Sequence, residues 1–384
     1  MPKYDFAVGS TNPETFPTEL FAEAAAAAIR KSGPQLSFYP GGYGNPELRA
    51  QMAERESTRE GVEVNPEHIA LMHGSMQGVT VVADYFRKHK DDIVIMEEFS
   101  YSGTISAFKG MGYEMIGIPV DNEGMRMDAL EECLAGLHRE NRPPRFIYTL
   151  ATYQNPTGTV MPKARRLQLV EIATRYNCVL VEDNCYGDVH YDGDKEPALY
   201  TLDPRPESIY IGSLSKIFAP GVRVGYLYAR PPMLQKLVGR RFDCGPNSLA
   251  AAIMAEYLRG RMWQHIEMAN TALKEKRDAT MEALEASLGN VCQISQPAGG
   301  LFIWIRLPDD VDRERLAKLA EERSFGYAKG SSFHVHNADV PFLRLAFGHI
   351  PTALIREGIP VLASCIADAR TNNTGTALTT RTKQ

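Results

Sequence analysis

The sequence predicts an α/β fold in which a large domain with a mostly parallel sheet is joined to a smaller α+β domain. Short apolar runs alternate with helical patterns through the first two thirds of the chain, the order expected when helices cover both faces of a parallel sheet. From residue 248 the chain becomes mainly helical, and a long helical pattern at 261–288 precedes a second group of short strands. A chain of 384 residues also exceeds one ordinary core, so two domains are expected.

In chain order, the first element is a loop at 8–17, rich in Gly, Pro and Asn, followed by an alanine-rich helix at 18–30. Seven apolar runs then predict the strands of the large sheet, at 69–72, 93–96, 114–120, 145–150, 178–182, 209–211 and 222–228. Helical patterns at 76–88 and 163–176 separate several of these strands. Ligands bind outside the carboxyl ends of the strands in such sheets, so we expect the functional residues in the loops that follow these runs.

The large domain is expected to comprise residues 31–260 and the small domain residues 261–370, with residues 1–30 contributing to the small domain and covering the active site. The small domain would contain strands within 292–308, a helix at 313–323, a strand at 342–347 and a last helix ending near 370. Residues 371–384 include six threonines and little that can be buried, so this tail is expected to be disordered.

Charge and cysteine usage limit the classes of function. A net charge of −5 gives no reason to expect nucleic acid or an anionic membrane as a partner. No run is long enough to span a bilayer, and the amino terminus lacks the pattern of a signal peptide. The six cysteines are scattered without paired spacing, which indicates neither a metal site nor a disulfide framework, but reduced thiols in a cytoplasmic protein.

A single lysine, Lys216, lies in the turn between two apolar runs, in the segment Ser-Leu-Ser-Lys-Ile-Phe-Ala-Pro-Gly-Val-Arg-Val-Gly that begins at Ser213. Burial lowers the pKa of a lysine and makes its amine nucleophilic enough to hold an aldehyde as a Schiff base. Ser213, Ser215 and Arg223 offer hydroxyls and a guanidinium that suit a phosphate. A lysine whose amine simply reaches solvent from a strand edge is equally compatible with these residues.

Two further loops carry polar residues directly after predicted strands. One, His-Gly-Ser-Met-Gln-Gly, contains Gly74, Ser75 and Met76 and opens a helix, where backbone N–H groups bind phosphate or where the turn is an ordinary helix cap. In the other, Asp183 ends an apolar strand and is followed by Asn-Cys-Tyr, with Tyr186 as the last residue. An aspartate at a strand end is also a common helix cap.

Three more side chains are candidates for contact with a ligand. Asn155, in the turn Tyr-Gln-Asn-Pro-Thr-Gly, offers an amide donor to an oxygen atom. Tyr101 offers a ring that can stack on a flat ligand, although an ordinary loop tyrosine explains it as well. Arg344 places a charge inside an apolar alternation, and a buried charge needs a partner. That partner is either the carboxylate of a ligand or an internal Asp or Glu.

These segments resemble the class I/II aminotransferases, which are fold-type I enzymes that use pyridoxal 5′-phosphate (PLP), and most of all their aminoadipate and kynurenine aminotransferase branch. The pattern Ser-Leu-Ser-Lys-x-x-Ala-Pro-Gly-x-Arg-x-Gly matches the cofactor-lysine segment of that family, and Asn-Pro-Thr-Gly at 155–158 is another specific signature. The resemblance covers roughly residues 8–369. It implies the fold-type I arrangement, with a seven-stranded, mostly parallel sheet in the large domain.

The resemblance also implies how the cofactor is held. Lys216 would form the Schiff base with PLP and remove the substrate α-proton, and Asp183 would keep the pyridine nitrogen protonated. Tyr186 and Asn155 would bind the ring oxygen, and Tyr101 would stack on the ring. The residues that would bind the phosphate are Gly74, Ser75, Met76, Ser213, Ser215 and Arg223.

For the substrate, the resemblance implies that Arg344 binds the α-carboxylate, with help from Asn155 and from the backbone near Gly9. Tyr39 would reach the PLP phosphate of the neighbouring subunit, which implies a two-fold homodimer with shared active sites. Tyr43, from the same loop, would line the substrate side. The chain departs from the family at Met76 and Cys185, where the family usually has a polar residue and a proline.

The function that the resemblance implies is transfer of an amino group from an α-amino acid to a 2-oxo acid. A PLP-dependent lyase or a β- or γ-substitution enzyme, including one that uses S-adenosylmethionine, has the same fold and cofactor residues. An unusual stretch at 243–247 and a short amino terminus keep this alternative open. A non-catalytic effector domain is less favoured, because little sequence precedes Gly9. No second arginine is clearly placed for an ω-carboxylate, and Trp304, Tyr4 and Phe16 permit an apolar or bulky substrate.

Overall fold

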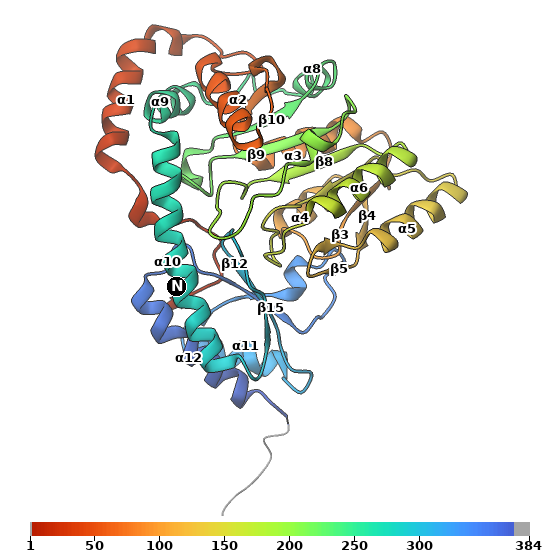
Figure 1. The fold of residues 1–384 in the computed structure, drawn as a ribbon, viewed down its shortest axis with the longest axis vertical. Coiled ribbons are helices and arrows are strands. Elements are labelled where there is room, and N and C mark those ends of the chain that lie inside the picture. Colours follow the sequence, from red (N-terminus) through yellow and green to blue (C-terminus); the bar gives the residue numbers. More distant parts are fainter. Residues whose placement is uncertain (1, 372–384) are drawn as a thin grey trace, which may run out of the picture.

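The two larger sheets of the described chain each have their own helices, and a long helix, α10, extends along both of them (Figure 1). The computed structural model describes residues 2–371, so the predicted disorder of residues 372–384 lies outside the described part. Between residues 2 and 371, no helix is long and apolar enough to cross a membrane.

The larger sheet has seven strands in the order β2-β10-β9-β8-β7-β3-β4. Neighbouring strands are parallel except at β10, which runs antiparallel to both β2 and β9. The predicted seven-stranded, mostly parallel sheet is therefore confirmed. The strand bounds are β2 Ile69–Met72, β3 Ile93–Glu97, β4 Glu114–Ile118, β7 Phe146–Thr149, β8 Leu180–Asn184, β9 Ile209–Ser213 and β10 Gly225–Ala229.

Three of the predicted strands, at 114–120, 145–150 and 222–228, are too long, and the local backbone explains the first and the last. β4 ends at Ile118 because Pro119 has no N–H to donate to a neighbouring strand. β10 begins at Gly225, not at 222, because Pro220–Val222 forms a 3-10 turn and Arg223 adopts a left-handed φ of 55°. Neither conformation continues a ladder of hydrogen bonds.

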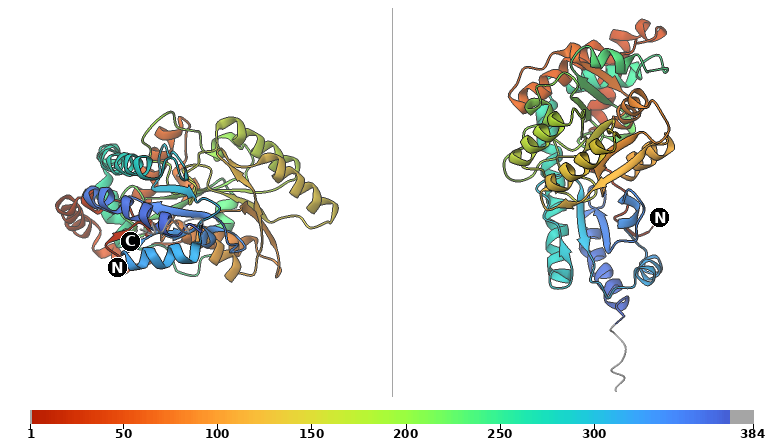
Figure 2. Two further views of the ribbon diagram at one scale, coloured as in Figure 1. Left: turned by 90° about the horizontal axis from the view of Figure 1, so that it is seen from below. Right: turned by 90° about the vertical axis from the view of Figure 1, so that its right-hand side faces the viewer.

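Helices cover both faces of this sheet (Figure 2) because alternate residues of each strand point to opposite sides. In β3, Val94 and Met96 pack in a core that includes α2, α3, α8 and α9, whereas Ile93 and Ile95 pack with α5 and α6. The helices of this part are α1 Thr18–Ser32, α2 Pro46–Glu60, α3 Ser75–Phe86, α4 Ser102–Gly110, α5 Met127–Arg139, α6 Lys163–Arg175, α7 Leu199–Leu202, α8 Met233–Val238 and α9 Ser248–Leu258.

The second sheet is antiparallel, with four strands in the order β11-β12-β15-β14. Its core contains apolar residues of α10, α11 and α12 together with those of the central strands. The bounds are β11 Gln293–Ile294, β12 Phe302–Arg306, β14 Ala328–Lys329, β15 Phe342–Ala346, α10 Met262–Leu288, α11 Arg313–Glu322 and α12 Thr352–Asp368. A short hairpin of β5 Val120–Asp121 and β6 Gly124–Met125 lies apart from both sheets.

Two segments connect the parts. In α10, Ile266 and Leu273 pack in the core of the seven-stranded sheet, and Leu284 and Leu288 pack in the core of the four-stranded sheet. At the amino terminus, β1, Tyr4–Asp5, pairs with β13, Phe325–Gly326, beside the small sheet, whereas α1 packs against α9 of the large part. The chain between β1 and α1 therefore passes from one part to the other.

Candidate active site

A cavity of about 490 Å³ lies between the two sheets. Its walls come from the loops after β2, β3, β7, β8 and β9, from the N-terminal segment, and from β12 and β15. This is the carboxyl edge of the parallel strands, where ligands bind in sheets of this type. The predicted residues that line the cavity are Gly9, Ser75, Met76, Tyr101, Asn155, Asp183, Tyr186, Ser215, Lys216, Arg223 and Arg344.

Four predicted residues do not line this cavity. Gly74 lies beside it as the residue that caps α3. Ser213 is buried, and its Oγ accepts a hydrogen bond from the backbone N–H of Ser215 at 3.1 Å. Tyr39 is 85% exposed, and the ring of Tyr43 lies 5.3 Å from the guanidinium of Arg49. Within this single chain, the loop that holds both tyrosines contributes no side chain to the cavity.

At one end of the cavity, the first turn of α3 forms an anion site. Gly74 caps the helix with a φ of 75° and without a side-chain cap, and the N–H groups of the following turn carry the positive end of the helix dipole. A Cβ atom on Gly74 would lie 2.4 Å from Nη2 of Arg223, so glycine is required for the arginine to approach. That Nη2 donates to the carbonyl of His73 at 2.9 Å. Backbone N–H groups and a guanidinium together suit a phosphate.

Asp183 lies in the floor of the cavity, at the end of β8, and is buried. Its Oδ2 accepts a hydrogen bond from the hydroxyl of Tyr148 at 2.7 Å, and its Oδ1 accepts one from the thiol of Cys185 at 2.7 Å. Burial raises the pKa of Asp183, and these two donors act in the opposite direction. No Lys, Arg or His of the described chain forms an ion pair with Asp183, which leaves its charge available to a cationic group in the cavity.

Lys216 points into the same cavity from the turn after β9. Its Nζ donates to the carbonyl oxygen of Gly9 at 2.8 Å and lies 5.8 Å from the centre of the Tyr186 ring. Burial lowers the pKa of Lys216. An amine with a lowered pKa is a better nucleophile and a better proton acceptor near neutral pH, so the structure gives this lysine the properties expected of it.

Arg344 is buried in β15 without a carboxylate partner in the described chain. Its Nη1 donates to Oδ1 of Asn155 at 2.9 Å, its Nη2 donates to the carbonyl of Ala7 at 2.6 Å, and its Nε has no hydrogen-bond partner. The guanidinium carbon lies 4.3 Å and 4.7 Å from the ring centres of Phe302 and Phe333. Burial lowers the pKa of Arg344 to about 10. An orphaned N–H on a buried cation is costly, which indicates that a ligand anion completes this site.

Several lining residues escaped the sequence analysis. Phe302 lies in a predicted apolar segment, where it is indistinguishable from a core residue, and Phe333 lies outside every predicted element. Tyr148 does not line the cavity, but it donates to Asp183 from inside strand β7 and was not predicted either. The three residues named as substrate candidates lie elsewhere: the Trp304 ring stacks on Phe342, and Tyr4 and Phe16 pack in the two cores.

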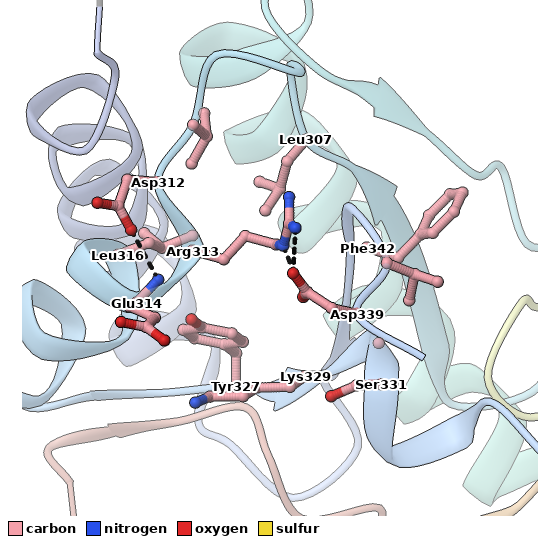
Figure 3. A pocket seen from close by; sticks show the side chains of 13 residues that line it. Leu307, Asp312, Arg313, Glu314, Leu316, Tyr327, Lys329, Ser331, Asp339 and Phe342 are labelled. Atoms are coloured by element: carbon pink, nitrogen blue, oxygen red, sulfur yellow. Dashed lines mark hydrogen bonds and ion pairs between the residues drawn. The ribbon is translucent and has the colours of Figure 1, made fainter. Parts of the chain in front are cut away.

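A second cavity, of about 440 Å³, is lined by residues of α11, of β14 and of the segment that leads into β15 (Figure 3). Arg313 points across it to Asp339, and Nε of Arg313 donates to Oδ1 of Asp339 at 2.8 Å (Figure 3). The guanidinium here already has an internal carboxylate, unlike that of Arg344. This cavity therefore does not have the unsatisfied donors that distinguish the first one.

Comparison with known proteins identifies the family. The family model for aminotransferase class I and II matches residues 6–362. The chain belongs to this family. This aminotransferase is 33% identical over 363 residues to the aromatic-amino-acid aminotransferase 1 of Thermococcus litoralis, which covers 94% of this chain and 87% of the relative. It is 32% identical to the 2-aminoadipate transaminase of Thermus thermophilus, over 92% of this chain and 87% of the relative.

Solved structures of similar enzymes have the same fold. The multiple substrate aminotransferase from Thermococcus profundus superposes with a TM-score of 0.89 at 31% identity, covering 95% of this chain and 91% of that one. The α-aminoadipate aminotransferase LysN from Thermus thermophilus, complexed with N-(5′-phosphopyridoxyl)-L-leucine, superposes with a TM-score of 0.87 at 32% identity, covering 95% and 92%. The aminotransferase is thus a PLP-dependent enzyme of fold type I, and the comparisons support transamination over the lyase alternative.

The residues of the cavity fit PLP. The turn at Gly74 offers an anion site that a Cβ atom would fill, Asp183 offers a buried carboxylate free of internal cations, and Lys216 offers a desolvated amine. These are the three groups that a phosphate, a pyridine nitrogen and an aldehyde require.

Proposed function

We propose that the cavity residues of this aminotransferase bind PLP in the roles that the family resemblance implies. Arg223 and the first turn of α3 would bind the phosphate, Asp183 the ring nitrogen, and Asn155 and Tyr186 the ring oxygen. Tyr101 would lie on the ring face. When bound, PLP supplies a ring that accepts electron density from the substrate α-carbon.

The observation that carries the proposal is the buried guanidinium of Arg344 with its unpartnered Nε. A bidentate carboxylate satisfies a guanidinium of this kind and compensates the cost of burying its charge. The carbonyl of Ala7 would release Nη2 to the substrate, because a carboxylate is the stronger acceptor. With the α-carboxylate fixed in this way, the α-carbon is held near Lys216.

Lys216 would act as the general base and acid at the substrate α-carbon. Its Nζ is bonded to the carbonyl of Gly9, so the N-terminal segment holds the amine at the cavity. The lowered pKa of Lys216 favours the neutral amine that removes a proton. The same N-terminal segment covers the cavity through Gly9 and Ser10 and limits the access of water.

We also propose that the preferred substrate is an α-amino acid with an uncharged side chain. Among the described residues that line the cavity, the cationic side chains are Lys216, Arg223 and Arg344, and each has a role toward the cofactor or the α-carboxylate. The remaining wall is apolar, hydroxylic or thiol-bearing, and consists of Ala7, Val8, Ser10, Ser102, Leu150, Cys185, Pro220, Phe302, Ala328, Ser332 and Phe333. An ω-carboxylate would be desolvated here without a counter-ion.

A panel of amino acids tests the reaction and its specificity together. Purified PLP-loaded enzyme is incubated with phenylalanine, leucine, aspartate or glutamate, with pyruvate or 2-oxoglutarate as acceptor, and the products are weighed by mass spectrometry. We expect the corresponding oxo acid and aminated acceptor, with kcat/KM for phenylalanine and leucine at least about 10-fold above that for aspartate. Release of a side-chain fragment would instead support the lyase, and equal rates for all four would overturn the specificity.

Substitution of Arg344 tests whether its guanidinium binds the substrate α-carboxylate. We expect Arg344→Gln to lower kcat/KM for amino acids by about 100-fold or more, because the substrate carboxylate loses its charged partner. Arg313→Gln, which changes an arginine in the second cavity, is the matched control and should leave kcat/KM unchanged. An Arg344→Gln enzyme with wild-type kcat/KM would place the carboxylate site elsewhere.

Further proposals concern the assembly. Phe38, Tyr39 and Phe242 are 75%, 85% and 86% exposed, and the two loops that hold them are in contact through Gly42 and Arg241. Exposed aromatic clusters mark protein–protein interfaces, which supports a two-fold homodimer in which Tyr39 and Tyr43 face the active site of the partner. Equilibrium sedimentation of wild-type enzyme and of Tyr39→Ala tests this arrangement.

The predicted domains and location also remain proposals. The two sheets have largely different cores, which supports a large domain at 31–260 and a small one at 261–370, with residues 1–30 shared between them; the first turns of α10 lie past this boundary but pack in the core of the large sheet. All six cysteines are free, which supports a reducing compartment such as the cytoplasm.

A further inference from the structure

Cys185 stands in the active-site cavity at a position where the family usually has proline. A proline there has no side-chain donor. In this chain the side chain carries an S–H group, which donates to Oδ1 of Asp183 at 2.7 Å. A cysteine at this position therefore adds a donor beside the Asp183 carboxylate.

With the Cys185 thiol, both oxygen atoms of the Asp183 carboxylate accept a hydrogen bond. Oδ2 of Asp183 accepts from Tyr148, whose hydroxyl is also 3.2 Å from Oγ1 of Thr104, and Oδ1 accepts from Cys185. Tyr148 is fully buried and comes from the neighbouring strand β7. With one donor on each oxygen, the plane of the carboxylate is fixed from both sides. Burial raises the pKa of the Cys185 thiol, so the sulfur keeps its proton and remains a donor.

We propose that Cys185 is a positioning residue for PLP, whose thiol orients the Asp183 carboxylate toward the ring nitrogen and limits the basicity of that carboxylate. The inference rests on the proposed role of Asp183. The thiol withdraws charge from Oδ1, so the carboxylate holds the ring proton less tightly and the ring keeps more positive charge.

The inference is tested by exchanging the side chain at position 185 and measuring the binding of PLP to the PLP-free protein by fluorescence. Cys185→Ala removes the donor, and we expect the Kd for PLP to rise about 10-fold, because the carboxylate that pairs with the ring nitrogen is no longer held in one orientation. Cys185→Ser keeps a donor and should return the Kd to within about 2-fold of wild type. Cys185→Pro, which reproduces the usual residue of the family, should behave like Cys185→Ala.

A spectroscopic readout separates positioning from a merely structural effect. The visible absorption of the bound cofactor is titrated with pH, without substrate. We expect the midpoint to move upward by about 0.5 pH unit or more in Cys185→Ala, because a less positive ring lets the nitrogen of Lys216 keep its proton to higher pH, and to return in Cys185→Ser. Tyr148→Phe removes the donor on the other oxygen and should move the midpoint in the same direction.

An Asp183→Ala variant distinguishes failure of this inference from failure of the proposed function. If Asp183→Ala binds PLP as tightly as wild type, the role of Asp183 is wrong and the inference falls with it. If Asp183→Ala loses PLP while both Cys185→Ala and Cys185→Ser keep the wild-type Kd and pH midpoint, the proposed function stands and the role of Cys185 is overturned. A loss in Cys185→Ala that Cys185→Ser does not repair would indicate packing of the sulfur, and would also contradict it.

Discussion

Two of the regions that hold desolvated cations, helix α2 and the active-site cavity, neutralise them in different ways. Beneath the seven-stranded sheet, Arg55 and Arg59 of α2 form ion pairs with Glu56 and Asp188. We call these four residues the α2 cluster. In the active-site cavity, Arg344 is buried and Lys216 is partly buried, but within the described chain each donates to backbone carbonyls or an amide and to no carboxylate.

The pKa shifts of the charged groups differ between the two regions in the same way. Burial alone would raise the pKa of Asp188, but the charges of Arg55 and Arg59 outweigh it and hold the pKa at about 2. In the cavity nothing outweighs burial, so the pKa of Arg344 falls to about 10 and that of Lys216 also falls. Paired buried charges maintain the fold, whereas unpaired ones are maintained for a ligand. Predictions that act on the two regions separately test this distinction.

The largest effect is expected from Lys216→Ala. Loss of the covalent attachment and of the general base should lower turnover by about 10,000-fold. Borohydride treatment followed by peptide mass analysis should find no pyridoxyl adduct on the segment that contains position 216. Because a desolvated cation is removed, the thermal midpoint of the PLP-free protein should not fall. Retention of a tenth of the turnover would refute the role of Lys216.

Arg55→Met acts on the other region and should affect stability first. It leaves Asp188 buried beside one fewer cation, and breaking a buried pair in this way costs about 3–5 kcal/mol. Denaturant unfolding of the PLP-free protein, compared with Arg344→Gln, measures the contrast. If Arg344→Gln destabilises the protein as much as Arg55→Met does, the claim that only the paired cations stabilise the fold is wrong.

Glu97 is a buried carboxylic acid with no ion pair to a cation among the described residues, so it can be compared with the paired Asp188. It is buried in β3, where it accepts from the hydroxyl of Thr149 and from the N–H of Leu150, and burial raises its pKa to about 7. Because this pKa is above that of the unfolded chain, the contribution of Glu97 to stability is present below about pH 4.5 and is lost as the pH rises through 7. Up to about 3 kcal/mol is involved.

The variant Glu97→Gln cannot ionise and should remove that pH dependence. Its unfolding free energy relative to wild type should therefore be larger at pH 8 than at pH 5. Denaturant unfolding of both proteins at pH 5 and at pH 8 measures this difference in unfolding free energy. If the difference is the same at the two pH values, the pKa of Glu97 is not raised. Asp188→Asn is the matched control. Because the pKa of Asp188 is lowered, its charged form stabilises the folded protein, and removing that charge should decrease the unfolding free energy at neutral pH.

The smallest effect is expected from Arg313→Gln in the second cavity. The side chains of Arg313 and Asp339 are 34% and 76% exposed, and solvent screens such a pair. The thermal midpoint should change by less than about 1 °C. A larger change would show that exposure is a poor guide to which ion pairs matter in this protein.

Sequence reasoning predicted the sheet because its strands are uninterrupted apolar runs, and it misplaced strand ends where Pro119 and the left-handed Arg223 act on the backbone. It selected half of the residues that line the cavity, from polar residues after apolar runs and from the family resemblance. Tyr148 and Phe302 were not predicted, since a ring inside an apolar strand has the same pattern whether it packs in a core or faces a ligand. Only the folded arrangement shows that Tyr148 reaches Asp183 from the next strand.

The continuity of α10 limits how the protein can be divided. Its first turns complete one core and its last turns complete the other, so a chain cut at residue 260 would leave Ile266 and Leu273 absent from the large part. A fragment that begins at 261 would carry those same side chains uncovered. We therefore expect neither half to fold when it is expressed alone. Two fragments could restore the fold only if α10 re-formed where they meet.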